Sequence, residues 1–427
     1  MNKERAYKLR ISDVVLQRRL EGKGALLIEG PKWCGKTTTA KQVAGSVLNL
    51  GDTITLRAAQ EALQVQPKVL LAGATPRLID EWQTLPEIWD MVRAEVDERQ
   101  DVGQFILTGS SVPPKPELLH HSGTGRIGRI RMRTMSLWES GESSGVIRLS
   151  DLFDGKAIEP QESTMPLEDI AFLICRGGWP QTTFLSDKNA LEEARDYYQA
   201  IYQTDILRVD SVRRNSERTR LILRSYARHQ GAAISFEKIC NDIKANDNMS
   251  ISYETLSDYI NALKKLFVIE DMPAWNPNLR SKVAVQSSET RYFADPSIGA
   301  AALGIAPKDL LNDLNTCGLF FETMAVRDLR VYAEALDGEV CHYRNAKGLE
   351  CDAVLHRRNG SYGLIEIKLG GKENIDKAVK TLTTLANNID TTKMQAPSFL
   401  MVLTAVGNFA YRRPDGVYVI PIGCLRD

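Results

Sequence analysis

The stretch GPKWCGKTTTA, residues 30–40, directly follows the apolar run ALLIE at residues 25–29. It fits the pattern G-x-x-x-x-G-K-[ST] at every fixed position, between a predicted strand and a predicted helix, as this pattern requires. Gly30 and Gly35 let the backbone wrap so that successive N–H groups point at one anion, and the helix N-terminus adds a favourable dipole. The stretch predicts a phosphate-binding loop made of Gly30, Pro31, Lys32, Trp33, Cys34, Gly35, Lys36, Thr37 and Thr38.

Two side chains of this loop have the chemistry that a nucleoside triphosphate needs. Lys36 is expected to reach the β- and γ-phosphates, and Thr37 offers its hydroxyl to Mg²⁺. Cys34 is interpreted as a spacer rather than a redox switch, because no second cysteine is near it in the sequence. The sequence therefore predicts ATP and Mg²⁺ as cofactors.

Length and composition exclude several classes of protein. A chain of 427 residues predicts two to four domains. The balance of 54 basic and 54 acidic residues gives no long-range field toward DNA or an anionic membrane, so any contact with nucleic acid needs a local patch. Seven cysteines without CxxC pairs indicate a reducing compartment. We expect a cytoplasmic protein without a membrane span, because no apolar run approaches the length of one.

The first third of the chain alternates apolar runs with amphipathic stretches. The runs at 25–29, 77–80 and 104–109 predict strands of a parallel α/β sheet. The polar stretch 139–165 is interpreted as an insertion or a connection to a helical lid, which we expect at about 165–212. Residues 1–212 are thus predicted to form one domain with its lid.

Helical patterns dominate the middle of the chain. Residues 213–285 read as three helices followed by extended segments, which predicts a winged-helix domain. The exposed face of its third helix has little net positive charge, and the wing adds Arg280 and Lys282. DNA binding by this element is therefore as strongly expected as a role as a protein contact or an AAA lid.

Acidic residues follow the second strand of the first domain, in PRLIDEWQ. Asp80 lies where it can hold the Mg²⁺ shell, and Glu81 is the candidate base for the attacking water. The strand in QFILTGSS ends in Ser110, with Thr108 as second choice, to sense the γ-phosphate or position the water; a purely structural serine is the alternative. Arg126 is a candidate for neutralising charge in the transition state, against a solvated surface arginine.

A second group of carboxylates lies in residues 286–427, the third predicted domain. Metal-dependent cleavage of a phosphodiester needs oxygen ligands for Mg²⁺ and a lysine near the attacking water, which Glu322, Asp352, Glu366 and Lys368 provide. A three-residue loop at 358–360 with a left-handed glycine would place Asp352 opposite Glu366, whereas a two-residue turn would aim the two acids at opposite faces. The first arrangement is predicted.

The segments GPKWCGKT, LIDEWQ, LTGSS, GRIGRIRMRTMSLWE and RGGWP resemble a large bacterial and archaeal family of AAA-type ATPases. Members carry a C-terminal domain of unknown function related to PD-(D/E)XK nucleases. The resemblance runs over nearly the whole chain and implies a multidomain α/β protein with an N-terminal AAA+ domain and a restriction-endonuclease-like C-terminal domain. It carries the nuclease roles onto Asp352, Glu366 and Lys368, and more loosely onto Glu322. The family's loop more often reads GPRxxGKT, and the Trp33-Cys34 variant alters none of the fixed positions.

These observations favour an ATP-driven machine or switch in which the nucleotide state controls DNA binding or cleavage by the other domains. The alternative is an ATP-dependent signalling or defence switch that binds a protein partner and has an inactive nuclease-like tail. A small-molecule kinase is disfavoured, because the Asp80-Glu81 pair suits water activation better than transfer to an acceptor. Self-association into a homo-oligomer is left open.

Overall fold

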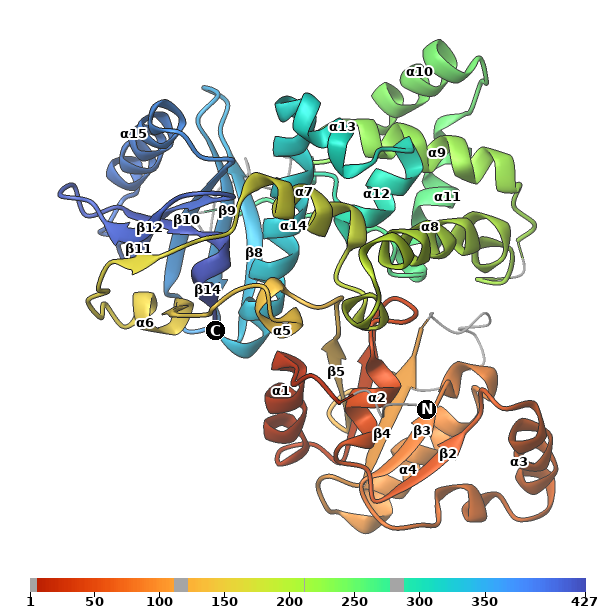
Figure 1. Ribbon diagram of the computed structural model, residues 1–427. Coiled ribbons are helices and arrows are strands. Elements are labelled where there is room, and N and C mark those ends of the chain that lie inside the picture. The colour runs from red at the N-terminus through yellow and green to blue at the C-terminus, as the bar shows by residue number, and fades with distance from the viewer. Residues whose placement is uncertain (1–5, 111–121, 211, 277–287) are drawn as a thin grey trace.

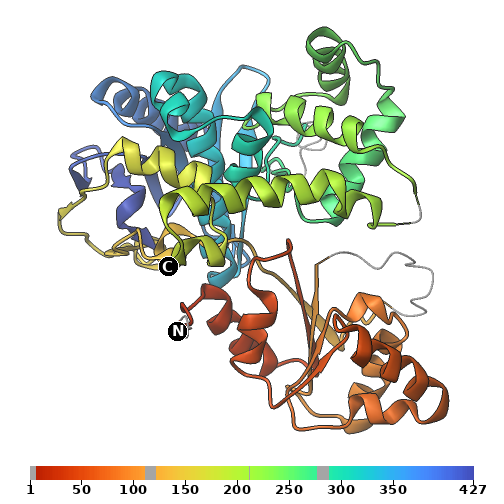
Figure 2. The ribbon, with the colours of Figure 1, turned by 45° about the vertical axis from the view of Figure 1, so that its right-hand side comes forward.

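The computed structural model describes residues 6–110, 122–210, 212–276 and 288–427. Figures 1 and 2 show an N-terminal α/β lobe at the bottom, with a C-terminal α/β lobe and a helical region side by side above it. No helix in these ranges is both long enough and apolar enough to cross a bilayer.

The N-terminal lobe is built on a five-stranded parallel sheet, which confirms the predicted sheet. The strands, in order across the sheet, are β2 (Ser46–Asn49), β3 (Arg77–Asp80), β4 (Phe105–Gly109), β1 (Ala25–Glu29) and β5 (Ile127–Arg131). The helices of the lobe are α1 (Ile11–Leu20), α2 (Lys36–Lys41), α3 (Thr53–Val65) and α4 (Ile88–Arg99). Strands β1 and β4 are apolar and buried along nearly their whole length, as expected for central parallel strands covered on both faces. Because β4 lies between β1 and β3, the carboxyl ends of these three strands meet at one edge.

The chain after β5 leaves this lobe and packs on the C-terminal one. Its elements are α5 (Leu137–Ser140), β6 (Ile147–Arg148), α6 (Leu149–Phe153) and β7 (Gln161–Glu162). Strand β6 pairs with β14 (Leu425–Arg426), and β7 pairs with β12 (Phe409–Arg412). The stretch interpreted as an insertion or lid connection is thus a strap along the C-terminal lobe.

Most of the helical region packs around one hydrophobic core, whose residues run from Trp179 to Ala302. Its helices are α7 (Leu167–Arg176), α8 (Asp187–Gln203), α9 (Ser216–Arg228), α10 (Phe236–Asp247), α11 (Tyr253–Lys265), α12 (Pro296–Leu303) and α13 (Pro307–Asn312). The buried apolar residues of α7 and α13 pack instead in a second core, which the region shares with the C-terminal lobe. After α11 the chain makes antiparallel bridges between Ile269 and Phe293 and between Met272 and Thr290. Three helices followed by such a pair is the order predicted for a winged helix, and that assignment stays a prediction. Arg280 and Lys282 lie outside the described residues.

The C-terminal lobe has a mixed seven-stranded sheet in the order β7-β12-β13-β11-β10-β9-β8. Its remaining elements are α14 (Leu314–Ala335), β8 (Gly338–Arg344), β9 (Glu350–Arg357), β10 (Tyr362–Lys368), α15 (Lys372–Asn388), β11 (Phe399–Thr404) and β13 (Tyr418–Pro421). Alternate residues of β9 and β10 enter two different cores: Ala353 and Ile365 pack in the core that contains α14, whereas Val354 and Leu364 pack in the core that contains α15. The two helices therefore cover opposite faces of the sheet.

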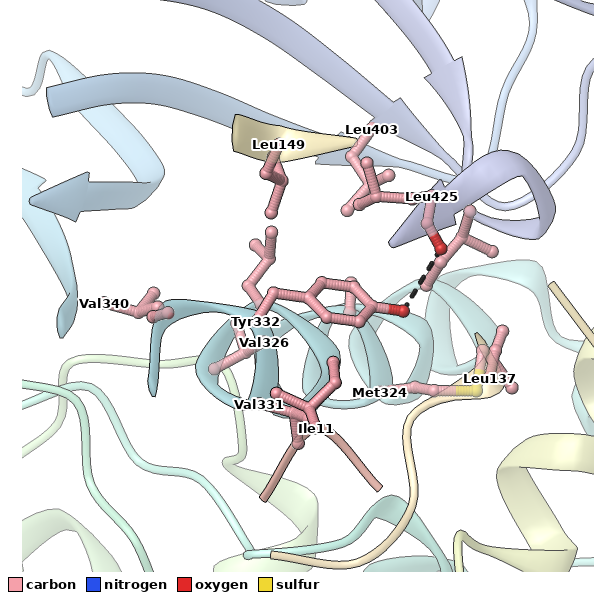
Figure 3. Packing of buried hydrophobic residues seen from close by; sticks show 14 of the residues in the cluster. Ile11, Leu137, Leu149, Met324, Val326, Val331, Tyr332, Val340, Leu403 and Leu425 are labelled. Atoms are coloured by element: carbon pink, nitrogen blue, oxygen red, sulfur yellow. Dashed lines mark hydrogen bonds between the residues drawn. The ribbon is translucent and has the colours of Figure 1, made fainter. Parts of the chain in front are cut away.

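Helix α14 is the element on which the lobes converge (Figure 3). Tyr332 is fully buried, and its hydroxyl donates to the carbonyl of Leu425 at 3.2 Å. Around it pack Ile11 of α1, Leu137 of α5 and Leu403 of β11. Segments from the start, the middle and the end of the chain thus share one core.

Candidate active site

A cavity of about 1100 Å³ separates the phosphate loop from the helical region. One wall is the loop itself with Glu81 and Ser110, and a second is the segment before α1, which includes Tyr7 and Lys8. The helical region closes it with Trp179, Pro180, Glu193 and Arg208. The predicted loop therefore borders a space large enough for a nucleotide.

The phosphate loop has the conformation that its glycines were expected to allow. Gly30 has a φ of 158°, and a Cβ there would lie 2.0 Å from the carbonyl oxygen of Met132. Gly35 has a φ of 104° and caps α2. The buried Lys36 ammonium donates to the carbonyls of Gly30 at 2.9 Å and Pro31 at 2.7 Å, so it lies at the centre of the loop.

Three oxygen-bearing side chains meet at the carboxyl edge of the sheet. Thr37 Oγ1 donates to Asp80 Oδ1 at 2.6 Å, and Thr108 Oγ1 donates to the same oxygen at 2.5 Å. Asp80 is buried, whereas Thr37 is only half-buried and lines the cavity. A hydroxyl and a carboxylate in contact beside a phosphate loop are the donor set that Mg²⁺ takes with a nucleotide, so these residues fit the predicted ion.

Glu81 is held in a particular position by its backbone and by two neighbours. It has a φ of 54° in the left-handed region, which costs a non-glycine residue free energy and is often found at functional sites. Ser110 Oγ donates to Glu81 Oε2 at 3.1 Å, and the Gln83 amide donates to the same oxygen. Ser110 thus contacts the predicted base. Gln83 was not predicted, although its place two residues after Glu81 is a signal available in the sequence.

The loop also contacts the helical region through side chains to which the sequence assigned no such contact. Lys32 Nζ lies 2.5 Å from Asp205 Oδ1, on the turn η5 (Asp205–Leu207). Trp33 is 60% exposed, and its ring lies 5.9 Å from that of Tyr197. Tyr197 in turn packs on Trp179. The residues between the fixed positions of the loop therefore join two parts of the molecule.

Arg10 braces the loop from the inside. It is buried, and it donates to the carbonyls of Cys34 at 2.8 Å and Arg133 at 2.9 Å. Its Nε lies 3.0 Å from Glu139, which forms a capping box with Ser136 at the start of α5. Cys34 is fully buried, in keeping with its interpretation as a spacer.

Arg126 is a predicted site residue that the structure does not bring to the cavity. The loop follows the carboxyl end of β1, whereas Arg126 precedes β5, and these strands are parallel. Its carbonyl accepts from Ala25 N at 3.2 Å, and its guanidinium pairs with Asp97 at 2.7 Å. Arg126 therefore lies at the opposite edge of the sheet, which corrects its placement beside the nucleotide of its own chain.

The C-terminal carboxylates come together as the register argument predicted. Arg357 N bonds to Ser361 O across a loop of three residues whose last, Gly360, has a φ of 87°. Ile365 pairs with Ala353, so the next position of the ladder sets Asp352 opposite Glu366. Residues 358–360 thus form the predicted loop, and the predicted register is confirmed.

Lys368 joins the two acids of this pair. Its Nζ lies 2.7 Å from Asp352 Oδ2 and 2.7 Å from Glu366 Oε2. Burial, with the adjacent charge of Asp352, raises the pKa of Glu366 to about 8. Burial lowers the pKa of Lys368, but the two carboxylates outweigh it and raise that pKa overall. The lysine ammonium therefore occupies the place between the acids.

Glu322 of α14 completes the group. The Tyr292 hydroxyl donates to it, and burial, with the charge of Asp352, raises the pKa of Glu322 to about 8. Glu322, Asp352 and Tyr292 line a cavity of about 460 Å³. In the described part of the chain, no three His, Cys, Asp or Glu side chains are arranged to hold a metal ion. The metal role of these acids stays a prediction.

The charges on α11 are largely used within the protein. Asp258 pairs with Arg214 at 2.8 Å, and Lys264 pairs with Asp271 at 2.8 Å and Glu289 at 3.0 Å. Because Lys264 is already paired with two carboxylates, it adds little free positive charge with which α11 could bind phosphates.

Three family models match the chain. One described as an AAA domain matches residues 22–140. Two described as domains of unknown function, DUF8612 and DUF4143, match residues 167–309 and 317–425. The first match spans the phosphate loop, Asp80, Glu81 and Ser110.

Known proteins similar to the chain are distant. Two uncharacterized proteins, from Mycobacterium bovis and Mycobacterium tuberculosis, are each 21% identical over 369 residues, which are 86% of this chain and 75% of each relative. Among solved structures, a Walker-type ATPase of Pyrococcus abyssi has a TM-score of 0.42 and 15% identity, over 68% of this chain and 94% of that one. The ORC1 protein of Aeropyrum pernix, solved in complex with DNA, has a TM-score of 0.28 and 13% identity, over 69% and 92%.

Proposed function

We propose that this chain, whose residues 22–140 match a family model described as an AAA domain, binds ATP together with Mg²⁺ and hydrolyses it in the cavity beside the phosphate loop. The contact of Thr37 with Asp80 at 2.6 Å, next to the Lys36 loop, is the observation that carries the proposal. This contact brings a hydroxyl from the start of α2 and a carboxylate from the end of β3 to a single point.

Each residue has a defined part in the proposed reaction. The loop N–H groups and Lys36 bind the phosphates, with Lys36 turning from the Gly30 and Pro31 carbonyls to the β- and γ-oxygens. Thr37 and Asp80 hold Mg²⁺, which neutralises phosphate charge when bound. Glu81 accepts the proton of the attacking water, and Ser110 keeps its carboxylate aimed at the cavity.

Calorimetric titration of ATP with Mg²⁺, together with phosphate release, tests this proposal. Lys36→Met removes the ammonium at nearly constant length, and we expect it to abolish both the binding heat and phosphate release. Lys41→Met, at the exposed end of the same helix, is the matched control and should retain both. A Lys36→Met protein that binds and hydrolyses ATP like the Lys41→Met protein would refute the proposal.

We propose further that the nucleotide state controls nucleic-acid binding or cleavage by the rest of the chain. The group of Asp352, Glu366 and Lys368 supports this proposal, because it has the residue types of a metal-dependent nuclease and because Lys368 lies 2.7 Å from each of the two acids. Cleavage would require Lys368 to release at least one acid to Mg²⁺. Incubation with DNA and Mg²⁺ or Mn²⁺ should give products that Lys368→Ala does not, while the exposed Lys372→Ala variant behaves as the wild type.

The second candidate is a signalling or defence switch that binds a protein partner, with a nuclease-like lobe that does not cleave. The paired charges on α11 favour it, because they leave that helix few free cations for phosphates. Rates of ATP hydrolysis with and without DNA separate the two candidates, since only the first predicts stimulation by DNA.

A further inference from the structure

A cation of the helical region faces the phosphate loop. Arg208 follows η5 and lines the same cavity as Lys36, Thr37 and Glu81. Its side chain is exposed, and it makes no ion pair or side-chain hydrogen bond with any residue that the structure describes. This guanidinium therefore has all its donors available to a ligand in the cavity.

The other cations that line this cavity already have partners. Lys8 donates to the Ser140 carbonyl at 2.6 Å, and Arg10 holds the Cys34 and Arg133 carbonyls. Lys32 pairs with Asp205, and Lys36 fills the loop. A triphosphate needs more positive charge than Lys36 alone can give, and Arg208 is placed to add it without breaking another contact.

The backbone of Arg208 is held in place by its neighbours in the chain, whereas its side chain is exposed. Ile206 and Val209, on either side, are buried in the core of the helical region. Arg208 N bonds to the Asp205 carbonyl at 3.0 Å, and the buried Asp205 carboxylate is held by Lys32 of the loop at 2.5 Å. The backbone from which this long side chain starts is thereby tied to the phosphate loop through Asp205 and Lys32.

We propose that Arg208 binds the terminal phosphates of the nucleotide and stabilises the charge of the transition state, and that Asp205 acts as its positioning residue. The inference rests on the ATP hydrolysis proposed above. A water oxygen bonds to the γ-phosphorus while the bond from that phosphorus to the β–γ bridging oxygen breaks; the electron pair leaves with ADP, and the water proton passes to Glu81. Charge grows on the oxygens between β and γ, which a planar guanidinium with parallel donors fits better than an ammonium does.

Arg208→Ala and Arg208→Lys test the role directly, with the exposed Arg57→Ala of α3 as the matched control. For an electrostatic donor to the transition state we expect kcat to fall about 10²- to 10³-fold in Arg208→Ala, with a smaller fall in Arg208→Lys and none in Arg57→Ala. ADP should bind nearly as in the wild type, while ADP with Mg²⁺ and aluminium fluoride, which mimics the transferred group, should bind much more weakly.

The outcomes separate this inference from the function on which it rests. A wild-type protein that does not hydrolyse ATP would overturn both. A wild-type protein that hydrolyses ATP, beside an Arg208→Ala protein with unchanged kcat and unchanged aluminium fluoride binding, would overturn only the role of Arg208. A folded Arg208→Ala protein, checked by its circular dichroism and melting curve, excludes a structural cause for a loss.

Asp205→Asn tests the positioning role. We expect it to lower kcat in the wild-type background and to have no further effect in the Arg208→Ala background, because Asp205 is proposed to act only by positioning Arg208. Asp196→Asn, on the exposed side of α8, is its control. Additive losses in the double variant would show that Asp205 acts independently and would overturn its assignment.

Discussion

Replacing Glu81 by Gln isolates the proposed base from the rest of the site. The amide has nearly the same shape as the carboxylate, and its oxygen still accepts from Ser110 Oγ, which lies 3.1 Å away. The contact of Thr37 with Asp80 does not involve Glu81. The change therefore removes the proton acceptor while leaving the phosphate loop and the Mg²⁺ ligands in place.

The expected loss follows from the role of Glu81. General base catalysis contributes about 10²- to 10⁴-fold to a rate, which corresponds to about 2.7–5.4 kcal/mol of transition-state stabilisation. The backbone of Glu81 is held at a φ of 54° and its carboxylate by two donors, so no other acid easily takes its place. We expect kcat to fall within that range and the affinity for ATP to stay close to that of the wild type.

Single-turnover hydrolysis and calorimetric binding of ATP with Mg²⁺ measure the two quantities separately. The exposed Glu87→Gln variant, just before α4, controls for the loss of one acidic charge. An unchanged hydrolysis rate in Glu81→Gln would refute the assignment of the base. A loss of ATP binding would show instead that the side chain holds the nucleotide.

Three further changes test the fold and its charges. Glu270→Ala leaves the Arg133 guanidinium, whose side chain is only 12% exposed, without its nearest carboxylate at 2.6 Å, and we expect it to lower the free energy of unfolding, measured with denaturant, by about 3 kcal/mol. Burial alone raises the pKa of Glu270, but the charge of Arg133 outweighs burial and holds this pKa far below 4.5. The contribution of the Glu270–Arg133 pair to stability should therefore be lost as the pH falls below 4.5. Glu366 has its pKa raised from 4.5 to about 8, so stability should fall as pH rises between these values, and Glu366→Gln should flatten that part of the stability curve. Gly360→Ala places a Cβ in open space at a φ of 87°, so only the backbone opposes it, and a loss of about 1–2 kcal/mol is expected in the same denaturation assay.

The position of the proposed nucleotide site could be predicted from the sequence, because local rules decide it. A glycine-rich loop between a strand and a helix has few functions, and the carboxyl ends of parallel strands meet at one edge. Asp80, Glu81 and Ser110 therefore had to lie near Lys36. The hairpin before Glu366 was predictable for the same reason, since Gly360 and the alternation of side chains limit the register.

Contacts between segments that are distant in the sequence could not be predicted from such local rules. Lys32 and Asp205 are far apart in the sequence, and nothing in either segment marks the other as its partner. Strands β6 and β7 have two residues each, too few to show a period, so the sequence indicated only an insertion or a lid connection where the structure has a strap. Arg126 was misplaced because a residue that precedes a strand and a residue that follows one lie at opposite edges.

The motifs that the proposed ATP site does not use meet in a buried polar network around α14. Asp328 accepts from Leu137 N at 2.9 Å, and Arg327 pairs with both Asp328 and Asp295. Asp295, which caps α12, accepts from Thr134 Oγ1 at 2.7 Å and from Gly178 N at 2.9 Å. The chain leaving β5, the RGGWP segment and α14 thus share buried hydrogen bonds, and each buried group left unpaired would cost about 1–3 kcal/mol.

The network constrains how the molecule can respond to a nucleotide. It ties the N-terminal sheet, the helical region and the C-terminal lobe together. The helical region also meets the phosphate loop through Lys32 and Asp205, and the lysine side chain is 43% exposed, so this ion pair is the weaker of the two connections. Relative movement is therefore expected to open or close the cavity at Asp205 and Arg208 while α14 stays attached to the sheet. Glu322 lies on that same helix, about 8 Å along its axis from Arg327. The acidic group of the C-terminal lobe would therefore move with the N-terminal sheet rather than with the helical region.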